Sequence, residues 1–248
     1  MKTKIILLAS LLLCIMFGAC KKKDATPKQQ IKLISKVTAV GGLNGDQTTV
    51  TSFSYDSKNR LIQRGGYYYT YSGDDLVSIS YGQGTNASLV YTFTYNNGVP
   101  VSMHIKTGPI DESYTYTVID GRVTKRTGSD SYSFVYTYSG DNLASSKIVT
   151  FVNATNYDYG LDKNPYYNPT AKYMLLNSND QENDYMSKNV VIQSYYQQYP
   201  FLGSQYNYVP GVDGYPKSVV VKTNPPNDPN SFIYKTLTFE YVMRDVAQ

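Results

Sequence analysis

The string YTYSGDDL at residues 69–76 returns almost unchanged as YTYSGDNL at residues 136–143, where Asn142 replaces Asp75. Weaker copies stand around and between them: FSYDSKNRL at 53–61, FTYNNGV at 93–99, YTVIDGRV at 116–123 and YNYVPGVDGY at 206–215. The copies between the two strong ones recur roughly every 22 residues, a spacing typical of repeat architectures. We therefore expect one structural unit to occur several times in this chain.

Each copy has the sequence pattern of a β-hairpin. Tyr91, Phe93 and Tyr95 alternate with threonines, so their rings project from one face of a strand. A turn follows at pairs that tolerate positive φ angles: Asn97-Gly98, Asp120-Gly121 and Asp213-Gly214. A single hairpin cannot bury its aromatic face, so successive hairpins should lie side by side. The predicted fold class is all-β, an antiparallel meander forming one large curved sheet or barrel-like structure, with a loop and short-helix insertion.

The pattern predicts a single β domain over residues 31–248, because all-β domains of this length are commonly one unit. Residues 29–40 should form a first strand, and the repeat region covers about 50–152. The range 153–203 is rich in asparagine and proline, so we expect an irregular insertion there, with one or two helical turns at 180–188. Residues 204–248 should supply three closing strands, with the prolines at 225, 226 and 229 in the last hairpin loop.

The first residues have the pattern of an export signal that ends at Cys20. Lys2 and Lys4 precede an apolar stretch over 5–17, and Gly18 and Ala19 are the small residues that signal peptidases require. The stretch is shorter than the roughly 20 residues that span a bilayer. It resembles the lipobox of bacterial lipoproteins, although a phenylalanine stands at position 17 where leucine is usual. We expect a signal peptide at 1–19, lipidation of Cys20 and a lysine-rich tether at 20–30. The alternative is an ordinary secretory signal with a stray cysteine.

The charge balance and the cysteine content limit the classes of partner and the means of stabilising the fold. From Ala25 onward positive and negative side chains are equal in number, so no electrostatic footprint for nucleic acid is present. Once the signal is removed, Cys20 is the one remaining cysteine, and its lipid would occupy the thiol. The fold must therefore be stable without an internal disulfide. The 27 tyrosines and eight phenylalanines, with no tryptophan, suit a β protein.

Two resemblances follow from the repeats. Tyr55-Asp56 followed by NRL at 59–61 is similar to the YD or RHS repeat. The whole pattern, including KNPY at 163–166 and GYP at 214–216, resembles a family of Gram-negative lipoproteins of unknown function with a porin-like antiparallel fold. That resemblance implies a fold and a location in the cell envelope, with the outer membrane favoured and the leaflet open. It implies no activity.

Catalytic patterns are weak. His104 is the only histidine, and its neighbours place it on the polar face of a strand, so we expect an exposed imidazole without a function. No serine-hydrolase elbow or zinc site accompanies it. The acidic cluster of Asp180, Glu182 and Asp184 lacks the glycine and spacing of a calcium loop, which favours a solvated loop. We expect no metal and no cofactor.

Tyrosines outside the strand pattern are the candidate ligand-binding residues. They either cap the end of the sheet or form a recognition surface, since tyrosine gives large contact area and a polar handle. These residues are Tyr166, Tyr167, Tyr195, Tyr196 and Tyr199. The leading hypothesis is a non-enzymatic, membrane-anchored envelope lipoprotein, a binding or scaffold module for a glycan, peptide or protein. A carboxylate-dependent glycan hydrolase and a membrane-spanning β-barrel are the alternatives.

Overall fold

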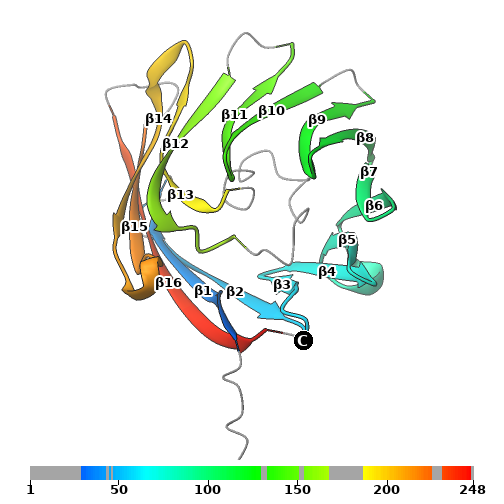
Figure 1. Ribbon diagram of the computed structural model, residues 1–248, viewed down its shortest axis with the longest axis horizontal. Coiled ribbons are helices and arrows are strands. Elements are labelled where there is room, and N and C mark those ends of the chain that lie inside the picture. The colour runs from blue at the N-terminus through cyan, green and yellow to red at the C-terminus, as the bar shows by residue number, and fades with distance from the viewer. Residues whose placement is uncertain are drawn as a thin grey trace, which may run out of the picture.

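The computed structural model describes residues 29–42, 45, 47–129, 133–150, 154–167, 187–224 and 231–246. Within these residues each strand pairs antiparallel with its sequence neighbours, and β1 pairs with β16, which closes the sheet into a barrel (Figure 1). The strands are β1 (Gln30–Gly41), β2 (Thr48–Tyr55), β3 (Leu61–Arg64), β4 (Tyr67–Ser72), β5 (Asp75–Tyr81), β6 (Leu89–Asn96), β7 (Val99–Thr107), β8 (Ile110–Ile119), β9 (Arg122–Gly128), β10 (Ser133–Ser139), β11 (Asn142–Ile148), β12 (Ala154–Lys163), β13 (Asn189–Tyr196), β14 (Tyr199–Val209), β15 (Ser218–Thr223) and β16 (Ile233–Asp245). Two short 3-10 helices, η1 (Gly84–Asn86) and η2 (Val212–Gly214), lie in connections.

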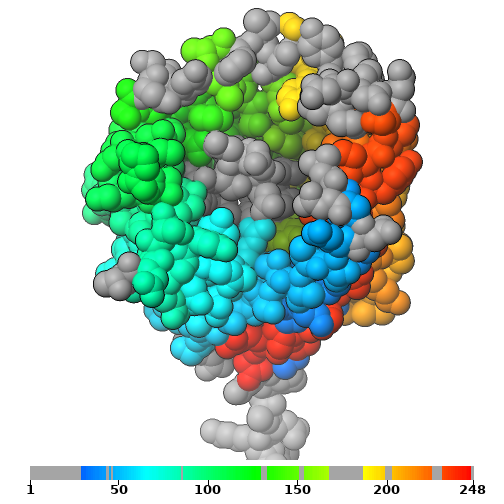
Figure 2. Space-filling view, turned by 180° about the vertical axis from the view of Figure 1, so that it is seen from behind, coloured from blue at the N-terminus to red at the C-terminus, as the bar shows by residue number. Residues whose placement is uncertain are grey.

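The all-β meander of hairpins predicted from the repeats is confirmed, and its form is a closed barrel. In the space-filling view the first strands, in blue, lie beside the last strands, in red (Figure 2). The structure differs from the expectation for 153–203, because β12, β13 and the first half of β14 lie in that range. Pairing with neighbouring strands outweighs the local asparagine and proline content there. Most of the expected helical segment at 180–188, and the prolines at 225, 226 and 229, lie outside the described residues.

The aromatic face of each repeat points into the barrel. Phe93 on β6 is 5% exposed, whereas its neighbours Thr92 and Thr94 are exposed on the outer face. The same alternation in the other repeats builds one continuous core inside the barrel, because alternate strand residues face opposite sides. Its buried members include Phe53, Leu61, Tyr69, Ile79, Met103, Val123, Tyr136, Leu143, Val219 and Phe239.

The tight turns have the predicted backbone. Asn97 and Gly98 have φ angles of 50° and 72°, and Asp120 and Gly121 have φ angles of 49° and 70°. Positive φ at both central residues is the geometry of two-residue hairpins whose twist matches that of the strands.

A β-bulge follows each of these turns and was not predicted. In the hairpin of β6 and β7, Thr94 pairs with Ser102 but Tyr95 pairs with Pro100, so one extra residue enters the returning strand. Bulges bend a strand and increase its twist, and their repetition helps the sheet to close. Equivalent shifts occur at Ser54/Tyr55, Thr70/Tyr71, Thr117/Val118 and Thr137/Tyr138.

The barrel has two different ends. The repeat turns all lie at one end, which we call the hairpin end. Gln30 pairs with Asp245 there, so both ends of the described chain leave the barrel at the hairpin end. The opposite end, called the far end, carries the connections between successive repeats, such as those after β1 and β3.

Candidate functional site

Tyrosine hydroxyls turn inward to the backbone near the hairpin end. The Tyr71 hydroxyl donates to the Leu61 carbonyl at 3.0 Å, and the Tyr138 hydroxyl donates to the Val123 carbonyl at 2.8 Å. Burial raises the pKa of Tyr71 well above its usual value, so its hydroxyl remains a donor at neutral pH. The same kind of bond joins Tyr55 to Ile34, Tyr159 to Leu143 and Tyr241 to Pro216. These bonds pull neighbouring hairpins together across the inside of the barrel at this end.

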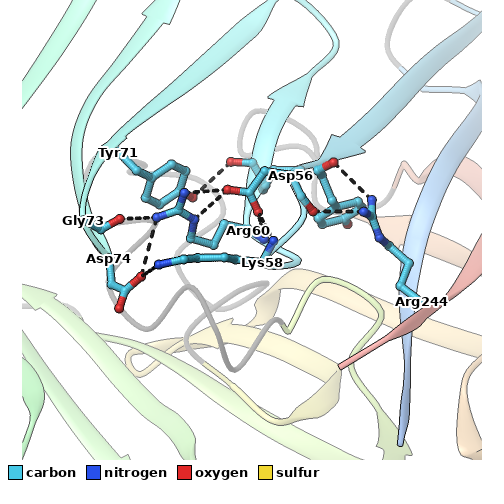
Figure 3. A network of polar contacts seen from close by, with 9 residues as sticks. Asp56, Lys58, Arg60, Tyr71, Gly73, Asp74 and Arg244 are labelled. Carbon is cyan, nitrogen blue, oxygen red and sulfur yellow. Dashed lines mark hydrogen bonds and ion pairs between the residues drawn. The ribbon is translucent and has the colours of Figure 1, made fainter. Parts of the chain in front are cut away.

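Arg60 joins two successive turns at the hairpin end (Figure 3). Its guanidinium contacts Asp56 Oδ2 at 2.6 and 2.7 Å, donates to the Gly73 carbonyl of the next turn, and lies 4.4 Å from the ring centre of Tyr71. Burial opposes ionisation of Asp56, but the hydrogen bonds and charge of Arg60 outweigh it and hold the pKa below the usual value. The residues that resemble a YD repeat thus form a bracket between hairpins.

A second copy of this bracket lies further along the barrel. Arg122 donates to the Gly140 carbonyl, contacts Asp141 Oδ1 at 3.0 Å and lies 5.2 Å from the ring centre of Tyr138. Asn59 adds a different link, because its side-chain amide donates to the Asp245 carbonyl of the last strand at 2.8 Å. Ordered contacts therefore hold the hairpin end of the barrel together.

A cavity of about 260 Å³ lies inside the barrel, between β1, β2, β3, β13, β14, β15 and β16. Towards the far end it is lined by Ala39, Thr49, Thr51, Arg64 and Lys235, of which Thr49 and Lys235 are exposed to solvent. Its deeper wall is apolar and includes Phe53, Val191, Val219, Leu237 and Phe239. The cavity therefore has a polar, accessible side and an apolar interior, as ligand pockets commonly have.

Tyr166 forms part of this cavity. Asn164 fixes the segment, because its side chain donates to the Ser187 carbonyl at 2.9 Å and accepts from the Tyr166 amide at 3.0 Å. The Tyr166 ring then lies 6.2 Å from Phe53 and 6.0 Å from Phe239 between ring centres. The KNPY segment of the sequence thus places an aromatic ring against the barrel core.

The other predicted tyrosines lie elsewhere. Tyr195 and Tyr196 end β13 at the far end, the first half-buried and the second 44% exposed, and neither is among the cavity residues. Tyr167 follows the Asn164 turn, where its amide donates to the Asn164 carbonyl. Tyr199 begins β14, and its side chain lies outside the described residues, as do Cys20 and the acidic cluster at 180–184.

Two charged residues were not singled out by sequence reasoning. Arg64 and Lys235 both face the cavity, and Arg64 lies 5.9 Å from the Phe53 ring centre. Neither lies in a motif. A third inward cation, Arg126, is 2% exposed and lies between the rings of Phe134, at 4.1 Å, and Tyr114, at 5.2 Å.

His104 lies on the outer face, as expected, and contacts Asp111 Oδ1 at 2.5 Å. The hydrogen bond from His104 holds the pKa of Asp111 below its usual value. Over the described residues, no three His, Cys, Asp or Glu side chains are grouped as metal ligands. In the same part of the chain, no helix is long and apolar enough to cross a bilayer.

Comparison with known proteins bears on the fold. No family model and no curated protein matches the chain. A solved porin-like protein from Bacteroides uniformis ATCC 8492 aligns with a TM-score of 0.55 and 14% identity, over 84% of this chain and 98% of its own. A porin-like protein from Bacteroides vulgatus ATCC 8482 aligns with a TM-score of 0.51 and 15% identity, over 86% and 99%. At such low identity the similarity establishes the fold, that of the porin-like antiparallel β-barrels.

Proposed function

We propose that this protein is a non-enzymatic binding module of the Gram-negative cell envelope, anchored by lipid on Cys20, which takes its ligand into the barrel cavity. The observation that carries the proposal is the difference between the two ends. Tyrosine and arginine contacts tie the hairpin end together, whereas Thr49 and Lys235 make the cavity accessible from the far end. A glycan or part of an envelope peptide or protein is the proposed class of partner.

The position of the chain ends suits this role. Because Gln30 lies at the hairpin end, a tether over 20–30 would attach that end to the membrane. The cavity would then face away from the lipid surface. Two or more acyl chains give stable anchoring. The porin-like relatives from Bacteroides support a location in the envelope.

The polarity of the wall favours this role over a membrane-spanning barrel. A transmembrane barrel has an apolar band on its outer face and a polar interior. Here the rings of Phe93 and Tyr136 face inward, and Thr92, Thr94 and Thr137 are exposed on the outer face. At these positions the outer face is suited to contact with water.

The glycan-hydrolase alternative has less support from the cavity. Retaining and inverting hydrolases use two carboxyl groups about 5 to 9.5 Å apart on either side of the substrate. Among the described residues that line the cavity, the charged ones are Arg64 and Lys235, and neither Asp nor Glu occurs. Binding without turnover is the activity that these residues support.

A binding screen tests the proposal. A soluble, unlipidated form that begins at Ala25 should bind a member of a panel of glycans, short peptides and envelope extracts, with hydrolysis products monitored in parallel. Thr49→Trp, which fills the accessible side of the cavity, should abolish binding. Thr92→Trp is the matched control, because Thr92 faces outward on β6. Equal binding by both variants would contradict a cavity site, and product release would favour the hydrolase.

A further inference from the structure

We infer that Tyr67 and Tyr81 form a stacking platform for a saccharide on the inner face of the barrel, at the rim of the far end. This inference rests on the proposed function, because it names the ligand class for the same opening and adds two residues to the site. It depends on where the two rings lie, on what holds them there, and on which ligands the wall around them can recognise.

The two tyrosines face the inside of the barrel. Tyr67 on β4 pairs directly with Tyr81 on β5, and Tyr69 pairs with Ile79 two positions along. Tyr69 and Ile79 are 7% and 1% exposed and belong to the core. Because residues two apart on a strand face the same side, Tyr67 and Tyr81 continue this inner row to the far end. Tyr67 also pairs with Arg64, a cavity residue, so the two rings adjoin the proposed site.

Both rings are accessible and ordered. Tyr67 is 37% and Tyr81 49% exposed, in contrast to the buried Tyr69. Their ring centres lie 5.1 Å apart and their planes meet at 63°, the edge-to-face arrangement that aromatic pairs favour. Each ring therefore restricts the other, and the exposed part of the pair is an aromatic surface of defined shape.

Gly66, in the turn between β3 and β4, provides the space for the Tyr81 ring. A Cβ at this position would lie 2.6 Å from Cε2 of Tyr81, so the ring would have to move. The backbone beside the ring is held as well, because the Gly82 amide donates to the Gly66 carbonyl at 3.0 Å. A ring placed in this way loses little freedom when a ligand binds, which lowers the cost of binding.

The pairing of the wall favours a saccharide over a peptide strand. Tyr67 has register partners on both β3 and β5, and Tyr81 has them on both β4 and β6. Neither strand therefore offers an edge at which an extended peptide could add by backbone hydrogen bonds. A ligand at this place must be recognised by the side chains. A sugar ring has C–H groups on its faces, which pack against an aromatic ring, and hydroxyl groups around its edge.

The tyrosine hydroxyls suit the edge of a sugar. Near the hairpin end the Tyr71 and Tyr138 hydroxyls donate to backbone carbonyls. Within the described part of the chain, the hydroxyls of Tyr67 and Tyr81 have no hydrogen-bond partner. A phenol hydroxyl both donates and accepts, so each can bond to a sugar hydroxyl while its ring contacts a C–H face. A wholly apolar ligand would bury these hydroxyls without partners, which is unfavourable.

Binding of defined oligosaccharides tests the platform. The probe is an array of neutral glucan, mannan and xylan oligosaccharides, and calorimetry then measures the affinity of the soluble form for the strongest binder. Tyr81→Ala should weaken binding at least about tenfold, and Tyr81→Phe, which keeps the ring, should weaken it clearly less. Tyr234 is the matched control, because it is 56% exposed and alternates with the inward residues of β16, so Tyr234→Ala should bind like the parent.

Gly66→Ala separates the position of the ring from its presence. Gly66 is not among the glycines with a positive φ angle, so alanine suits its backbone, and the added methyl group should displace the Tyr81 ring. This variant should bind the same oligosaccharide about fivefold more weakly, because the platform is no longer preorganised. Its circular dichroism and melting temperature should remain close to those of the parent.

The outcomes separate this inference from the proposed function. If no oligosaccharide on the array binds, or if Tyr67→Ala and Tyr81→Ala bind the strongest one like the parent, the saccharide platform is wrong. The proposed function still stands in that case if Thr49→Trp abolishes binding of any compound in the wider panel. If binding of the oligosaccharide depends on Tyr81 and no compound depends on Thr49, the platform stands and the cavity site is wrong.

Discussion

The two arginine brackets at the hairpin end predict a difference in stability between otherwise equivalent substitutions. Arg60→Met and Arg122→Met each keep the apolar stem and remove the guanidinium. The Arg60 and Asp56 side chains are 16% and 20% exposed, whereas those of Arg122 and Asp141 are 37% and 57% exposed. Burial lowers the local dielectric and screening by water, so the first pair should contribute more to the free energy of unfolding.

The magnitudes follow from these contacts. Arg60 makes two close contacts with one carboxylate oxygen, and hydrogen bonds to charged groups contribute about 1.5–3 kcal/mol. Its position over the Tyr71 ring adds about 1 kcal/mol. We expect Arg60→Met to cost about 3 kcal/mol. The exposed ion pair between Arg122 and Asp141 contributes only about 0.2–1 kcal/mol to the free energy of unfolding. With the contact to the Tyr138 ring included, Arg122→Met should lower that free energy by about 1 kcal/mol.

Urea unfolding followed by tyrosine fluorescence and circular dichroism measures both costs from the shifts in midpoint. A double-mutant cycle with Asp56→Asn should give a coupling of about 2 kcal/mol with Arg60→Met. The cycle of Asp141→Asn with Arg122→Met should give less than about 0.5 kcal/mol. Equal costs for the two arginines, or additive effects of Asp56→Asn and Arg60→Met, would refute the argument that burial of the bracket determines its contribution.

Further predictions concern the backbone, the core and the anchor. Gly203→Ala should destabilise the barrel severely, because the added Cβ would lie 2.0 Å from the Ser194 carbonyl oxygen. In urea unfolding it should lower the free energy of unfolding more than the control Gly73→Ala does. Burial raises the pKa of Tyr69 to about 12, so its stabilising effect is complete below pH 10 and declines as the pH rises towards 12. Tyrosinate absorbance should therefore rise together with loss of structure in alkaline titration, and independent ionisation in an intact fold would contradict this. Cys20→Ala should abolish palmitate labelling and release the protein from the membrane fraction, and persistent label would refute lipidation there.

The repeat hairpins were predictable from the sequence because their signals are local. Asn97-Gly98 determines a two-residue turn, and the alternation of Tyr91, Phe93 and Tyr95 with threonine determines which face is buried. The same units predicted either a curved sheet or a barrel-like structure, and the need to protect sheet edges did not decide between them. Closure is established by the pairing of β1 with β16. Strands β12 and β13 were missed, since their strand character depends on pairing with neighbours rather than on their own composition.

The bulges explain why the cavity and inward cations were not found from the sequence. Strict alternation from Val123 would place Arg126 on the outer face. The extra residue in the β8–β9 pairing, where Thr117 pairs with Lys125 and Val118 with Val123, reverses the side and turns Arg126 inward. Arg64 and Lys235 likewise meet one cavity only because β16 closes onto β1. Register and closure are properties of strand pairs, and no single segment contains them.

The two ends of the barrel differ in how regular their connections are. At the hairpin end the same contacts recur, because tyrosine hydroxyls donate to backbone carbonyls and arginines donate to the next turn. When a substitution removes one such contact, the equivalent contacts in the neighbouring repeats remain. At the far end the connections differ: a two-residue turn follows Arg64, and a longer segment with η1 follows Tyr81. Loops on a rigid scaffold tolerate sequence change and carry binding residues. Under the proposed function, in which the lipid anchor lies at the hairpin end and the ligand enters from the far end, changes in the far-end connections would alter ligand choice without loss of the repeated contacts that hold the barrel together.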